Sequence, residues 1–266
     1  MNTFTKFAVC AAAFAGAAVV SAETLNLTQP GSFLNPMRKS ITEANGQIKT
    51  KGKTFLISKK IFTIDPAKAY TVSVKVDGDK AKPSALYIGF QVIDANGRAY
   101  SAVNWQGQHQ TFTQVARAAK KGDKVLYVKD GSRWVSHSAF QIALNAKADD
   151  SDVPNKQIVR NPIASKAKQG DVWALTLKEP LKADIAAGTN VRQHVDGGYF
   201  YSIIRTVPAG KESIYTGTVQ GAAKKVGSFN GKQWPVNAKK AQLLLLVDWG
   251  NAGADLTFKD ISLTIK

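Results

Sequence analysis

Two segments of the chain combine aromatic rings with amide, imidazole or guanidinium groups. The first segment contains Tyr100, Trp105, Gln106, Gln108 and His109, and the second contains Tyr199, Tyr201 and Arg205. Sugar recognition outside cells relies on aromatic rings that pack against the apolar face of a sugar, while polar groups bind its hydroxyls. We therefore expect both segments to frame one carbohydrate-binding groove. The alternative is that Trp105 and Tyr201 fill the core, because large aromatic side chains are mostly buried.

The remaining tryptophans have different contexts. Asp248 and Trp249 end an apolar strand and form a further candidate ligand pair, with packing under a loop as the alternative. Trp134 and Trp173 lie at predicted strand edges, so we expect them in the core of a small β unit. Trp234 directly precedes a proline in a predicted loop, so an exposed side chain is one alternative for it.

Catalysis has one candidate form, a polysaccharide lyase. Such an enzyme needs a base and a group that neutralises a uronate carboxylate, and His109, Tyr201, Arg205 and Gln108 are of these types. The ordered motifs of alginate lyases, an Arg-rich strand, Gln-x-His and Tyr-x-Lys-x-Gly, do not occur in that order. A Gly-x-Ser-x-Gly elbow and a phosphate loop are also absent from the sequence. We therefore favour binding over catalysis.

The inventory of possible metal ligands is small. The three histidines are His109, His137 and His194. No two of them have the spacing of zinc ligands. The acidic cluster consists of Asp149, Asp150 and Asp152. It lacks the glycine and the distal glutamate of an EF-hand loop, so we predict a solvated turn there.

The elements that must position these residues are strands. Alternating apolar and polar residues separated by turn signals predict an all-β chain. The predicted strands include 55–64, 70–76, 86–92, 199–207, 213–219, 242–249 and 256–265. The segment 242–249 is almost continuously apolar, which predicts a central strand covered on both faces. Short strands without intervening helices favour a β-sandwich.

The middle third of the chain has a different pattern of apolar and polar residues. Two apolar, hairpin-like pieces with strands at 124–128 and 173–177 flank a polar, loop-rich centre. We expect an inserted small β domain at 112–196, within a discontinuous β-sandwich formed by 23–111 and 197–266. An insertion of this size can pack independently.

The outer segments resemble the jelly-roll carbohydrate-binding modules of the galactose-binding-like superfamily. The resemblance rests on the pattern from Lys60 to Val74, in which a strand enters a Pro-x-x-x-Tyr turn, and on the terminal segment from Leu256 to Leu263. It implies a jelly-roll β-sandwich, here with an inserted small β module, and a last strand that carries an acidic residue, matched by Asp260. The family often uses this position for calcium, so the resemblance implies Asp260 as the candidate ligand of a structural calcium, and it implies no other cofactor.

The N-terminus predicts export. Residues 1–22 combine Lys6, an apolar run and the small-x-small sequence that ends at Ala22, which is typical of a cleaved signal peptide rather than a transmembrane segment. The only cysteine, Cys10, leaves with this segment, so no disulfide is expected. We expect a secreted or periplasmic protein.

Charge limits the partners. The full chain has 36 Lys and Arg against 19 Asp and Glu, and the loss of Lys6 leaves a net charge of +16. The excess is spread evenly, which fits either polyanion attraction or a solvated surface. Nucleic acid is an improbable partner outside the cytoplasm. We expect a monomer that binds a glycan, with an acidic polysaccharide as a candidate; the alternatives are a lyase for uronic-acid glycans and a structural envelope or interaction protein.

Overall fold

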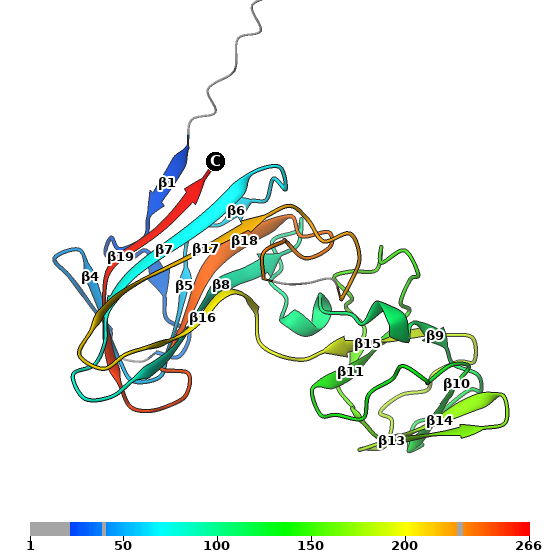
Figure 1. Cartoon of the computed structure of the whole chain (residues 1–266). Helices are drawn as coiled ribbons and strands as arrows, with labels where there is room; N and C mark the ends of the chain where they lie inside the picture. The colour runs from blue at the N-terminus through cyan, green and yellow to red at the C-terminus, as the bar shows by residue number, and fades with distance from the viewer. Residues whose placement is uncertain (1–21, 39–40, 228–230) are drawn as a thin grey trace, which may run out of the picture.

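The computed structural model describes residues 22–38, 41–227 and 231–266, and it is an all-β protein. Residues 1–21 of the predicted signal peptide lie outside the described residues. No helix in the described ranges is long and apolar enough to cross a membrane. Two β-sheets form a sandwich, and a smaller body lies beside it (Figure 1).

The first sheet, which we call sheet A, has the strand order β17-β7-β19-β4-β3, and β1 also pairs with β19. Its strands are β1 (Glu23–Asn26), β3 (Ile41–Ala44), β4 (Gln47–Lys51), β7 (Ala69–Asp77), β17 (Glu212–Gln220) and β19 (Asp255–Ile265). All pairs are antiparallel.

The second sheet, sheet B, has the order β16-β8-β18-β5-β2, and β6 also pairs with β18. Its strands are β2 (Phe33–Leu34), β5 (Thr54–Ser58), β6 (Phe62–Thr63), β8 (Ser84–Ile93), β16 (Phe200–Val207) and β18 (Lys240–Val247). The apolar run that predicted a central strand is β18, with β8 on one side and β5 on the other. The single strand predicted at 55–64 is instead divided between β5 and β6.

The strand order makes the sandwich a jelly roll, as predicted. The order β17-β7-β19-β4 faces β16-β8-β18-β5. Among these eight strands, those consecutive along the chain alternate between the two sheets, except that β8 and β16 are neighbours in sheet B. This is the four-by-four arrangement produced by two Greek keys. Alternation along β7 buries Val72, Val74 and Val76 between the sheets, and β8 buries Leu86, Ile88 and Phe90 from the other side.

Trp234 lies in the sandwich core, near one end of the strands. It is fully buried, and its ring is 5.1 Å from that of Tyr70 and 4.9 Å from that of Phe90. The sequence left open whether Trp234 is exposed, and its full burial excludes this. A loop residue reaches the core here because the segment before β18 packs across the end of the sandwich.

The smaller body forms between β8 and β16. Its sheets have the orders β12-β11-β15-β9 and β10-β14-β13. The strands are β9 (Thr113–Gln114), β10 (Val125–Val128), β11 (Phe140–Leu144), β12 (Ile158–Val159), β13 (Ile163–Gln169), β14 (Val172–Leu177) and β15 (Asn190–Val195). It has a separate hydrophobic cluster that contains Trp134, with Trp173 packed against it. We call this body the insert.

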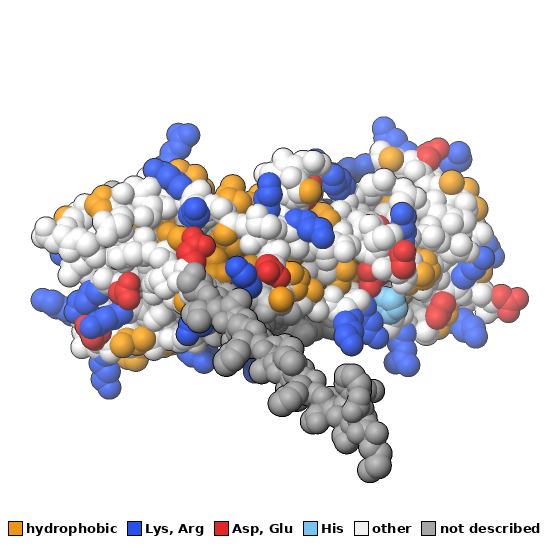
Figure 2. Space-filling model, turned by 90° about the horizontal axis from the view of Figure 1, so that it is seen from above, with side chains coloured by type: hydrophobic (Ala, Val, Ile, Leu, Met, Phe, Trp, Pro, Cys, Tyr) orange, Lys and Arg blue, Asp and Glu red, His pale blue; other side chains and the backbone are white. Residues whose placement is uncertain are grey.

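Basic side chains are scattered over the surface. Figure 2 shows Lys and Arg on both the sandwich and the insert, with fewer Asp and Glu between them. No single large basic patch dominates this view, in line with the even spread of charge along the sequence.

Candidate functional site

The outward face of sheet B is unusually apolar for a sheet surface. The register places Leu246, Tyr87 and Ile204 in one row across β18, β8 and β16, next to Phe55 on β5. The next row contains Leu34, Ile57, Leu244, Gly89 and Tyr201. A solvated sheet face ordinarily carries polar side chains. Two adjacent apolar rows on the outside of a sandwich therefore need a covering or a partner.

Four aromatic rings partly cover this face. Phe55 and Tyr199 lie with ring centroids 5.3 Å apart, and Tyr87 and Tyr201 are also 5.3 Å apart. Beneath them, Ile57, Leu244 and Leu246 are almost fully buried. The four rings themselves are only partly buried, so each keeps some surface in contact with solvent. We call Phe55, Tyr87, Tyr199 and Tyr201 the aromatic cluster.

Burial disfavours ionisation of two tyrosines of the cluster. It raises the pKa of Tyr201 to about 12 and also raises the pKa of Tyr199. Both phenols are neutral at physiological pH, as an unperturbed tyrosine also is, and can donate as well as accept hydrogen bonds. The hydroxyl of Tyr201 accepts a hydrogen bond from the backbone N–H of Tyr199 at 3.3 Å, which fixes one ring against the chain of the other.

Gly89 lies in the middle of the face because the backbone leaves no room for a side chain. A Cβ at this position would lie 1.9 Å from the carbonyl oxygen of Phe200 and 2.8 Å from Cα of Tyr201. The pairing of β16 with β8 shifts register between Tyr201 and Ile203, so β16 approaches β8 closely here. The glycine thus permits the bulge that holds Tyr201 beside Tyr87.

Trp249 lies at one end of this face. It follows β18, its backbone N–H donates to the carbonyl oxygen of Ala85 on β8, and its side chain is 36% exposed. The ammonium nitrogen of Lys53 lies 4.3 Å from the centroid of the Trp249 ring. This is a cation–π contact between the residues that flank β5 and β18.

Asp248, the predicted partner of Trp249 in ligand binding, is fully buried and serves the loop instead. Its carboxylate accepts hydrogen bonds from the backbone N–H groups of Ala252, Gly253 and Ala254 and lies 3.5 Å from the hydroxyl of Ser84. A carboxylate satisfied in this way has no exposed oxygen for a sugar. Asp248 therefore fixes the loop that follows Trp249, and its buried oxygens are closed to a ligand.

Tyr100 and Trp105 are also buried, in contrast to a role in an open groove. Their rings lie 6.2 Å apart beneath the junction between sandwich and insert. With Phe200 and Tyr199 they line a cavity of only about 10 Å³, which cannot hold a sugar ring. For Trp105 the core interpretation is therefore the right one, whereas Tyr201 lies in the aromatic cluster.

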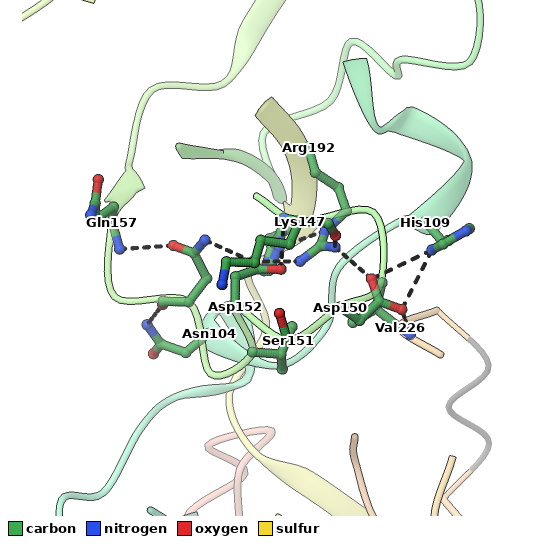
Figure 3. Close-up of polar contacts among 12 residues, drawn as sticks. Asn104, His109, Lys147, Asp150, Ser151, Asp152, Gln157, Arg192 and Val226 are labelled. Carbon is green, nitrogen blue, oxygen red and sulfur yellow. Dashed lines mark hydrogen bonds and ion pairs between the residues drawn. The ribbon is translucent and has the colours of Figure 1, made fainter. Parts of the chain in front are cut away.

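A network of charged residues joins the insert to the sandwich and contains His109 (Figure 3). The guanidinium of Arg192 donates to Asp150 at 2.6 Å and to Asp152 at 2.8 Å. Asp150 also accepts from the backbone N–H of Val226, which belongs to the loop before β18, at 2.9 Å. His109 lies 3.4 Å from the same carboxylate. We call these residues the junction network.

The prediction of a solvated turn at the aspartate cluster is wrong for two of its three members. Asp150 is buried and Asp152 is mostly buried, because the fully buried Arg192 needs compensating charge. Only Asp149 is exposed, and its carboxylate accepts a hydrogen bond from the backbone N–H of Ser151. The sequence contained no signal that Arg192, forty residues away, would lie beneath this loop.

His194 completes the junction network from within β15. Its Nε2 accepts from Nε of Arg192 at 3.1 Å, and its Nδ1 donates to the carbonyl oxygen of Val103 at 2.6 Å. Burial and the adjacent guanidinium lower the pKa of His194 to about 4. The imidazole is therefore neutral at physiological pH and acts as a structural bridge.

The remaining predicted site residues are dispersed. Gln108 begins a short turn, and its side-chain oxygen accepts from the amide of Gln110 at 3.3 Å. Arg205 on β16 is exposed and folds back on the carbonyl oxygen of Ile204. The structure thus brings Tyr199 and Tyr201 together, places Trp249 on the same face, and leaves Gln108 and His109 at the junction.

Asp260 lies on the outward face of sheet A, on the far side of the sandwich. It is exposed and pairs in register with Lys75 of β7. Among the described residues, no group of three or more His, Cys, Asp or Glu side chains is arranged to hold a metal ion. The calcium implied by the resemblance finds no support in the surroundings of Asp260.

Comparison with known proteins adds little. No protein-family model matches the chain, and no curated protein matches it. Among solved structures, it is similar to the complex of VP16 and VP17, the two major capsid proteins of bacteriophage P23-77, with 8% sequence identity and a TM-score of 0.15. That alignment covers 92% of this chain and 99% of the capsid chain. The jelly roll therefore rests on the strand order alone.

Proposed function

We propose that the protein binds a polysaccharide, without chemical conversion, on the outward face of sheet B. The observation that carries the proposal is the aromatic cluster: four partly exposed rings fixed over a buried floor of Ile57, Leu244 and Leu246. Rings held in this way present apolar surface to a sugar without losing side-chain entropy on binding. The neutral phenols of Tyr199 and Tyr201 supply hydrogen bonds to its hydroxyls.

The proposal includes export. The signal peptide expected at residues 1–22 would deliver the protein to the periplasm or the medium, where polysaccharides are available. A free monomer suffices, because the outward face belongs to a single chain.

The residues proposed for a lyase do not favour that reaction. A base needs a pKa near the working pH, whereas burial raises the pKa of Tyr201 to about 12. His109 faces Asp150 in the junction network, and Tyr201 packs against Tyr87 in the aromatic cluster. No contact among the described residues joins His109 and Tyr201 into one site.

Affinity electrophoresis of the full chain after export tests the proposal. The protein is run through native gels that contain one soluble polysaccharide each, and retardation measures binding. We expect Tyr87→Ala and Tyr201→Ala to abolish the retardation of the wild type. Tyr127→Ala is the matched control, because Tyr127 is a partly buried tyrosine of the insert that stacks against Arg117.

Three results would overturn the proposal. One is unchanged retardation of both cluster variants, provided that their circular dichroism is native. A second is the absence of retardation by every polysaccharide tested. The third is the release of products, such as unsaturated sugars that absorb in the ultraviolet, because it would make the protein an enzyme.

A further inference from the structure

The charges on the outward face of sheet B are all of one sign. Lys240 is the one charged residue among the outward positions of the paired strands, at the end of β18 beside Ile93. Strand alternation through Phe55 and Ile57 continues this face to Lys53 before β5 and to Lys59 after it. None of the described residues that point outward from these strands is a carboxylate. An acidic molecule would therefore meet no exposed carboxylate on these strands.

Lys53 is held in place without being neutralised. Its ammonium lies over the Trp249 ring, and its side chain forms no ion pair or hydrogen bond with any residue in the described ranges. A cation–π contact orients an ammonium while leaving its charge available to an anion. The adjacent carboxylate of Asp248 forms no ion pair with it, because its oxygens are buried and bonded to Ser84 and the loop backbone.

The lysine and the aromatic cluster lie on one continuous surface. Lys53 is two residues from Phe55 on the same side of the chain, so the two lie about 7 Å apart along the strand. Lys53 and Lys59 flank β5 at its two ends, and a fully extended chain would separate them by at most about 20 Å. A chain along β5 would therefore meet a cation at each end and aromatic rings between.

We propose that the ligand is an anionic polysaccharide and that the Lys53–Trp249 pair binds its carboxylate or sulfate groups. The inference rests on the proposed function and gives it a substrate class. The aromatic cluster provides the apolar contact with sugar rings, and Lys53 favours anionic chains over neutral ones. Trp249 keeps the ammonium in position and adds a further ring at the end of the face.

Titration calorimetry of the full chain after export tests the inference with three probes: polygalacturonate, sulfated carrageenan and neutral xyloglucan. We expect affinity for at least one anionic probe that falls as sodium chloride is raised, because ions screen the exposed pairs. The two anionic probes distinguish carboxylate from sulfate. We expect Lys53→Gln to weaken anionic binding about fivefold to tenfold, with Lys53→Arg retaining most of it.

Lys49→Gln is the matched control. Lys49 is an exposed lysine of β4 in sheet A, so its loss changes the net charge equally without touching the outward face of sheet B. Equal effects of Lys53→Gln and Lys49→Gln would overturn the inference, and so would binding of xyloglucan as tight as that of both anionic probes. If xyloglucan binds as tightly as both anionic probes and Tyr201→Ala abolishes its binding, the inference about charge fails but the proposed function survives. If no probe binds, both fail.

Discussion

Replacement of Asp150 by alanine tests the junction network, which holds the insert on the sandwich. Asp150 is buried and accepts from Arg192, from the backbone N–H of Val226 and from His109. Its removal leaves the buried guanidinium of Arg192 with Asp152 as its remaining carboxylate. Breaking a buried ion pair from one side costs about 3–5 kcal/mol. For a chain of this size, that lowers the melting temperature on the order of 10 °C.

Asp149→Ala is the matched control for this prediction. Asp149 is the preceding residue, is exposed, and bonds only within its own turn to Ser151. Calorimetry and urea unfolding of both variants at pH 7 compare them directly. If Asp150→Ala lowers the free energy of unfolding no more than Asp149→Ala does, the stabilising role of the junction network is refuted. A separate low-temperature transition in Asp150→Ala would show that the insert and the sandwich have lost their coupling.

Three further predictions concern stability. His194 has a pKa of about 4 in the folded protein but titrates near 6.5 when unfolded, so the unfolded state binds more protons between these pH values. The free energy of unfolding should therefore fall by about 3 kcal/mol as the pH drops from 6.5 to 4. Urea titrations across that range should show a flatter pH dependence for His194→Gln. Gly89→Ala should destabilise the sandwich by at least about 1–3 kcal/mol, because its Cβ would overlap the backbone of Phe200, whereas Gly197→Ala, with open space around it, should not. Asp248→Ala should cost about 1–3 kcal/mol in urea unfolding, since it leaves the buried N–H of Ala254 without its acceptor; an unchanged midpoint would contradict the assigned role of Asp248.

Much of the sandwich could be predicted from local pattern. Apolar and polar residues alternate along β7 and β8 because one face of each strand is buried. In β18 the residues of both faces are apolar, which indicated a central strand covered on both sides. The same run held an unused signal for the site, because a covering on the second face requires further apolar groups there. The outward residues Leu244 and Leu246 need apolar partners, and Phe55 and Tyr87 on the neighbouring strands supply them.

The sequence segments that looked richest in binding groups were a weaker guide. Tyr100 and Trp105 lie close to His109 in sequence, yet the chain turns between them, so the rings are buried while His109 faces the insert. Lys53 and Trp249 meet only through the pairing of β5 with β18, almost two hundred residues apart. Contacts of this kind depend on register and topology, which local spacing does not contain.

The most direct test of the central claim is to map the bound ligand by nuclear magnetic resonance. The isotope-labelled protein is titrated with an oligosaccharide of whichever polysaccharide it retains, and amide and aromatic shifts are followed. The account predicts that the perturbed signals belong to the outward residues of β5, β8, β16 and β18, with Phe55, Tyr87 and Tyr201 among them. Perturbations confined to sheet A or to the insert would contradict it.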